Sequence, residues 1–292
     1  MLQQIANGLF QGSIYALFAI GFTLVFGILR QLNLAHAAVF TAGAFAAVEA
    51  TDQGFPAWLV FPLVAVAGLA LGALLETVAF RPLAGRRDEH FAGLISSVAF
   101  GGMLIALLRG YFGSEPGSLP SGTLPSTVLE VAGVTVTFTQ LLTLACSLAL
   151  MVALTWLVRR TTFGSSMRAV AENPEAAKVL GVNVRRVTLS TYALSSMLGT
   201  LAGTLMAVNV GQADLDMGLN IELTGFAVII LGGLGSLWGA VAAGLLLGLA
   251  EALTIHFIGA SWQDVVAFSL LFAVLLMRPQ GLFGAGKTRE VL

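Results

Sequence analysis

A series of apolar runs fills this chain, and most of them are long enough to cross a lipid bilayer. A crossing helix needs about 20 mostly apolar residues, because the hydrocarbon core is roughly 30 Å thick and each helical residue rises about 1.5 Å. In hydrocarbon the backbone must pair its own polar groups, which favours helices. We expect membrane-spanning helices over residues 5–29, 34–50, 57–80, 92–109, 139–158, 188–209, 222–234, 236–257 and 262–278.

The long apolar stretch from 222 to 257 is too long for one helix. We divide it at Gly232-Gly233-Leu234-Gly235-Ser236, because glycine weakens a helix interior. The piece 222–234 is short for a full crossing, so eight and nine crossings both fit the pattern. The sequence therefore predicts an all-α fold, in which residues 1–292 form a single polytopic transmembrane helical bundle with broken or re-entrant helices.

The composition excludes several other classes of protein. Hydrophobic residues make up 57% of the chain and charged residues 10%, against roughly 25% charged in soluble domains. No basic stripe suggests nucleic acid as a partner. The single cysteine, Cys146, offers neither a disulfide framework nor a cysteine metal site. Without a Walker phosphate loop, a serine nucleophile elbow or clustered histidines, we predict no enzyme, no cofactor and no metal.

Lysine and arginine gather in three segments, and these residues mark cytoplasmic loops. We therefore expect 81–91, 159–187 and 278–292 inside, and 110–138, which lacks Lys and Arg, outside. Within that outward segment, residues 134–138 alternate, which fits either a short strand or an interfacial stretch. No basic residue precedes the first apolar run, so we expect it to be retained as a helix and not cleaved as a signal peptide. A lipid bilayer is the expected location.

The cytoplasmic segment 159–187 contains the signature of a short helix outside the membrane. Asn173 suits the N-cap and Pro174 the first helical position. Glu175 favours the positive end of the helix dipole, and Gly181 fits the stop. Ala176 and its neighbour Ala177 are small enough to let another protein surface approach. We therefore expect a helix of about two turns that contacts a partner.

Polar residues within the apolar runs are costly in lipid and are candidates for function. Glu251 has no basic residue near it in sequence, so it either lines a path or bonds another helix. Asn33 and His36 flank a predicted helix break, where a histidine is more often structural than a ligand. Glu76, five residues from Arg81, is interpreted as an interfacial acid. The candidates for a translocation path or helix break are Asn33, His36, Gly233, Gly235 and Glu251.

Small residues recur at helical spacing in the run 236–257. Gly244 and Gly248 form a small-xxx-small pair, which lets helix backbones approach closely in lipid. The pattern predicts tight packing within the bundle or contact with a second subunit.

The triplet Glu175-Ala176-Ala177, followed by Gly181, matches the EAA motif of ABC importer permeases. Four further stretches resemble permeases of branched-chain amino-acid importers: Leu32-Asn33-Leu34-Ala35-His36, Phe80-Arg81-Pro82-Leu83, Leu231-Gly232-Gly233-Leu234-Gly235-Ser236 and Arg278-Pro279-Gln280-Gly281-Leu282-Phe283. Two features depart from that family. Ala37 and Ala38 stand where relatives often carry Gly and an acid, and the segment 110–138 is individual.

The resemblance implies a function and a set of partners. The chain would be a permease subunit working in the lipid bilayer with a second, homologous permease subunit, two ATP-binding subunits and a periplasmic substrate-binding protein. Coupling to the ATP-binding subunits would fall to Arg168, Glu172, Glu175, Ala176, Ala177 and Gly181. The solute would be a branched-chain or related hydrophobic amino acid, while urea, short amides and aromatic acids stay open. A secondary transporter is less consistent, because it would want paired charges in the membrane.

Overall fold

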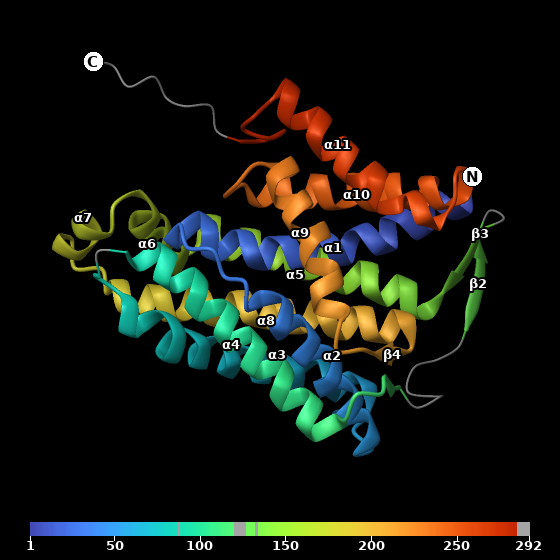
Figure 1. The fold of residues 1–292 in the computed structure, drawn as a ribbon, viewed down its shortest axis with the longest axis horizontal. Coiled ribbons are helices and arrows are strands. Elements are labelled where there is room, and N and C mark those ends of the chain that lie inside the picture. The colour runs from blue at the N-terminus through green and yellow to red at the C-terminus, as the bar shows by residue number, and fades with distance from the viewer. Residues whose placement is uncertain (87, 120–126, 132–133, 285–292) are drawn as a thin grey trace.

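The computed structural model describes residues 1–292 except 87, 120–126, 132–133 and 285–292. Arg87, Lys287, Arg289 and part of the predicted outward segment therefore lie outside the described residues. The bundle consists of helices packed roughly lengthwise, with short strands at one end (Figure 1). Its elements are α1 (Leu2–Leu29), α2 (His36–Asp52), α3 (Ala57–Leu75), α4 (Glu89–Phe112), β1 (Gly117–Ser118), β2 (Val128–Val131), β3 (Val134–Thr137), α5 (Phe138–Arg160), α6 (Thr162–Glu172), α7 (Pro174–Val179), α8 (Val184–Val210), β4 (Gln212–Ala213), α9 (Met217–Gly232), α10 (Leu237–Phe257) and α11 (Gln263–Met277).

The all-α polytopic bundle is confirmed, with a span count close to the prediction. Among the described residues, 7 helices are long and apolar enough to cross a membrane, and Met217–Gly232 is a shorter apolar helix. Two of the predicted crossings correspond to short helices, α2 with 17 residues and α9 with 16. At about 1.5 Å per residue, each is roughly 25 Å long and falls short of the hydrocarbon thickness. Nearly all of α2 is buried inside the protein, so its backbone needs no lipid-facing length.

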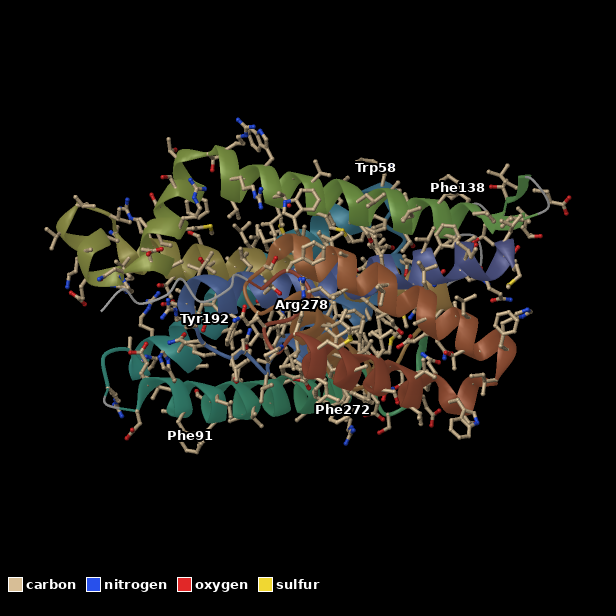
Figure 2. The ribbon with its side chains drawn as sticks, turned by 90° about the horizontal axis from the view of Figure 1, so that it is seen from above. Trp58, Phe91, Phe138, Tyr192, Phe272 and Arg278 are labelled. Atoms are coloured by element: carbon tan, nitrogen blue, oxygen red, sulfur yellow. The ribbon has the colours of Figure 1, made fainter. Side chains whose placement is uncertain are left out.

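The core of the bundle is α1, which packs against α10, α8, α5 and α9. Its middle residues are almost completely buried. By contrast, α3, α4, α5 and α11 carry many exposed apolar side chains. Trp58, Phe91 and Phe272 point away from the bundle, whereas Tyr192 lies within it (Figure 2). Apolar side chains can face lipid tails without a free-energy penalty, so these helices form the lipid-facing periphery.

Glycines bring α1 and α10 together. A Cβ atom added to Gly248 would lie 2.4 Å from the Cα of Gly12, and one added to Gly244 would lie 2.7 Å from the Cα of Ala16. Backbones this close leave no room for side chains, which is the packing expected of small residues in membranes. The Gly244/Gly248 pattern therefore serves packing within this chain.

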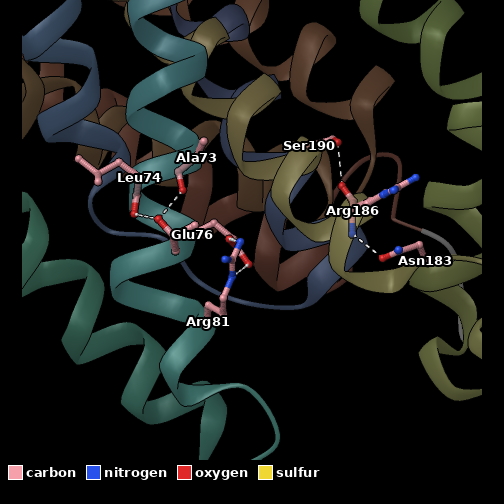
Figure 3. A network of polar contacts seen from close by, with 8 residues as sticks. Ala73, Leu74, Glu76, Arg81, Asn183, Arg186 and Ser190 are labelled. Carbon is pink, nitrogen blue, oxygen red and sulfur yellow. Dashed lines mark hydrogen bonds and ion pairs between the residues drawn. The ribbon is translucent and has the colours of Figure 1, made fainter.

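A π-helical turn, Glu76–Phe80, ends α3 and pairs an acid with a base. The N–H of Arg81 bonds the carbonyl of Glu76, five residues back. That wider turn places both side chains together: the Arg81 guanidinium donates to the Glu76 carboxylate at 2.5 and 3.2 Å (Figure 3). Because Glu76 is buried, its carboxylate needs an opposite charge nearby, and Arg81 supplies it.

Short strands close the end of the bundle farthest from α7 (Figure 1). Of the two alternatives for residues 134–138, the structure has the strand: β3 covers Val134–Thr137 and pairs antiparallel with β2, while Phe138 begins α5. The Gln3 side chain exchanges two hydrogen bonds of 2.8 Å with the Thr135 backbone, which ties β3 to α1. Thr137 and Gln140 then form a capping box that starts α5.

Candidate functional site

The predicted helix in the segment 159–187 is confirmed as α7. The Asn173 side chain accepts a hydrogen bond of 3.0 Å from the Ala176 N–H and caps the helix, with Pro174 at its first position. The helix ends in a Schellman motif: Gly181 has φ +85°, its N–H bonds the Lys178 carbonyl, and the Val182 N–H bonds the Ala177 carbonyl. Glycine adopts this left-handed conformation without the strain that a Cβ atom brings.

The structure differs from the sequence expectation at Ala177, which is only 2% exposed. A Schellman motif brings the residue at this helix position against the one that follows the glycine. Ala177 and Val182 accordingly belong to the same apolar cluster. Ala177 therefore packs within this chain, and its contact with a partner stays a prediction.

The outward face of α7 is more apolar than the sequence analysis recognised. Val179 is 86% exposed and Leu180 is 80% exposed, while Glu175 and Ala176 are also exposed. Two large apolar side chains in a polar loop outside the predicted spans were the signal that we missed. An exposed apolar patch of this kind marks a contact surface.

Arg168 and Glu172 lie on α6 and are both exposed, whereas Gly164, Met167 and Val170 form its buried face. The Arg168 guanidinium donates a hydrogen bond to the Val158 carbonyl in the last turn of α5, where a cation also complements the helix dipole. Glu172 lines a cleft of about 640 Å³ between the segment of α6 and α7 and the ends of α1 and α3. The Glu76–Arg81 pair and the Asn183-capped start of α8 border this region (Figure 3).

The glycine break between α9 and α10 is built as a junction of three chain segments. Gly233 has φ +100° and Gly235 φ +85°. The N–H groups of Leu282 and Phe283 bond the carbonyls of Leu231 and Gly232 at 2.8 and 3.0 Å. Sequence reasoning singled out both stretches but could not show that they pair.

Arg168 and Gly235 line one cleft of about 390 Å³, together with residues of α1 and Phe283. The structure thus brings one predicted coupling residue and one predicted helix-break residue to the same place.

Asn33 and His36 lie in the core. The His36 ring is 1% exposed, contacts Phe18 and Phe22, and has its Nε2 atom 3.2 Å from the Phe18 carbonyl oxygen. Because a carbonyl only accepts, Nε2 carries the proton. A Cβ atom on Gly199 would lie 2.8 Å from this ring. The tight packing favours the structural role for His36.

Glu251 lies in the C-terminal part of α10 and is 2% exposed. The Tyr15 hydroxyl and the Gln263 amide donate hydrogen bonds of 2.7 and 2.9 Å to its Oε2 atom. Its Oε1 atom has no partner among the described residues. Glu251 thus bonds two other helices, as one of the two sequence alternatives proposed. Its unpartnered oxygen leaves the other alternative open.

Comparison with known proteins defines the family. A family model described as the permease component of the branched-chain amino acid transport system matches residues 4–275. The chain belongs to this family. As a permease component with these apolar helices, it is a multi-pass protein of the bacterial inner membrane. The resemblance seen in the motifs is confirmed.

Two relatives align with the permease over nearly its whole length. The high-affinity branched-chain amino acid transport system permease protein BraD of Pseudomonas aeruginosa is 34% identical over 99% of this chain and 98% of its own. LivH of Escherichia coli, described in the same words, is 33% identical over 99% of this chain and 97% of its own. Among solved structures, PsaBC from Streptococcus pneumoniae in complex with Fab has a TM-score of 0.53 at 16% identity, covering 94% of this chain and 91% of that one. That likeness concerns the fold alone.

Proposed function

We propose that this chain is the permease subunit of an ATP-driven importer for branched-chain or related hydrophobic amino acids. The observation that carries the proposal is the family match, with relatives named for branched-chain amino acid transport at 33–34% identity over nearly full length. These names favour amino acids over the urea, amides and aromatic acids that the sequence left open.

The proposed complex contains a second, homologous permease subunit, two ATP-binding subunits and a periplasmic binding protein that delivers the solute. Loops rich in Lys and Arg are cytoplasmic, so α7 would face the ATP-binding subunits. The strand-bearing end would then face the binding protein. In the bundle these two ends lie far apart (Figure 1), as they must if the two kinds of partner bind on opposite sides of the membrane.

The contact with the ATP-binding subunit would be made by the outward face of α7. Val179 and Leu180 supply apolar area, Glu175 and Ala176 flank it, and Gly181 fixes its shape. A displaced α7 would carry α6 with it, and the Arg168 bond to Val158 links α6 to α5. Arg168 also lines the same cleft as Gly235 of the glycine junction, so a displacement of α6 would change the shape of that cleft. Glu172 would support the loop from the cleft that it lines.

Co-purification of the ATP-binding subunits tests this proposal. The double variant Val179→Asp, Leu180→Asp places two carboxylates on the proposed contact without disturbing buried groups. We expect it to insert normally but to lose the ATP-binding subunits and solute uptake. Thr162→Asp is the matched control, since it adds an exposed acid at the start of α6 in the same segment. Wild-type recovery of the ATP-binding subunits with the double variant would contradict the role of α7.

A further inference from the structure

A cleft lined by side-chain amides opens at the end of the bundle farthest from α7. Its volume is about 350 Å³, and it lies among α1, α5, α8, α10 and α11. Few lipid-facing positions would tolerate so many polar groups, because each costs free energy in hydrocarbon. The amides come from Gln4, Asn7, Gln11, Gln140, Asn209 and Gln263.

Among the residues that the structure describes, Glu251 is the one acid lining this cleft, and no Lys, Arg or His lines it. Its Oε2 atom is held by Tyr15 and Gln263, while Oε1 is buried without a partner among the described residues. A buried carboxylate oxygen without a donor is costly unless a ligand supplies one. The group that best meets it is a cation with several N–H donors, such as an ammonium.

A second cleft, of about 410 Å³, shares Gln263 with the first and is lined by Tyr15, with Asp214 and Asp264 also in its lining. Its lining includes apolar side chains from three helices, among them Met206, Ile221 and Phe268. Gln263, one donor to Glu251, thus lines both the amide-rich cleft and the partly apolar one, and Tyr15, the other donor, lines the second. This combination matches a zwitterion that carries an apolar side chain.

We propose that Glu251 binds the α-ammonium group of the amino acid as it passes through the permease, an inference that rests on the proposed function. The amide N–H groups of the first cleft bind the α-carboxylate of the solute. Its apolar side chain lies toward Met206 and Phe268. Tyr15 and Gln263 are positioning residues that hold the carboxylate of Glu251 in place.

The test uses the whole complex reconstituted in liposomes with its binding protein. Two quantities are measured: uptake of radiolabelled leucine and ATP hydrolysis stimulated by the leucine-loaded binding protein. Glu251→Gln keeps the shape of the side chain and removes its charge. We expect its leucine uptake to fall at least tenfold while stimulated ATP hydrolysis stays within twofold of wild type. Glu251→Asp, which restores the charge, should recover part of the uptake.

Glu222→Gln is the matched control. Glu222 lies on α9, also has a buried carboxylate oxygen without a partner among the described residues, and lines neither cleft. We expect uptake close to wild type. Wild-type uptake by Glu251→Gln overturns the proposal, and so does an equal loss of uptake and ATP hydrolysis in both Glu251 variants, since that result means a structural role. Failure of the proposed function would look different, because the wild-type complex itself would take up no leucine.

Discussion

Replacing Gly181 by valine should uncouple the permease from its ATP-binding subunits. Gly181 ends α7 at φ +85° with no other atom within 4 Å of the place where a Cβ would stand. The strain of the variant is therefore purely conformational. A residue with a Cβ atom costs about 1–2 kcal/mol in the left-handed region, and a β-branched one resists it further.

That cost is large compared with what holds α7 in place. The helix has six residues, and its Asn173 cap contributes about 1 kcal/mol. The two Schellman hydrogen bonds, to Lys178 and Ala177, depend on the same glycine conformation. If α7 must open to relieve the strain, 1–2 kcal/mol lowers its formed fraction, and so its apparent affinity for the ATP-binding subunit, by about 5–30-fold.

Gly54→Val is the control for this experiment. Gly54 lies in the exposed turn between α2 and α3 at φ +80°, also with nothing within 4 Å. Both variants carry the same kind of strain, but only one carries it at α7. We expect Gly181→Val to lose co-purified ATP-binding subunits and uptake, and Gly54→Val to keep both. Equal recovery of ATP-binding subunits with the two variants would refute the reasoning.

Three further predictions concern sidedness, packing and docking. In a background with the native cysteine replaced by alanine, a cysteine introduced at Lys178 should react only with thiol reagents that enter the cytoplasm. A cysteine introduced at Ser118 should react with thiol reagents that cannot cross the membrane. The reverse pattern would mean that the topology is inverted. Gly248→Leu should force α1 away from α10, at a cost of about 1–3 kcal/mol or more, and so lower the unfolding temperature in detergent. Gly102→Leu is the control and should not lower it, because its position on α4 has open space. Equal unfolding temperatures for the two variants would contradict the close packing of α1 on α10. Replacing two exposed acids of the predicted outward segment, Glu115 and Glu130, with lysine should weaken capture of the binding protein, measured by surface plasmon resonance. Unchanged capture would exclude these two acids from the docking surface.

Sequence patterns predicted local structure well where that structure depends only on residue type and on near neighbours in the sequence. The N-cap, the proline and the terminal glycine of α7 act within a few residues of one another, so their order alone predicts the helix. The alternation before residue 138 likewise predicted a strand as one of two alternatives, and β3 is that strand. The short α2 was predicted as a full crossing and the nature of α9 was left open, since apolar composition does not distinguish a helix buried in protein from one surrounded by lipid.

By itself the sequence determined the fold class, the family and the residues of the α7 helix, because hydropathy, motif spacing and helix signals are local properties. Only the tertiary structure decided which face each residue presents. It buried Ala177, exposed Val179 and Leu180, joined the glycine break to residues 282–283, and placed Tyr15 beside Glu251, which is 236 residues away. Such contacts depend on how helices distant in sequence pack together, and no periodicity within one helix specifies its partner.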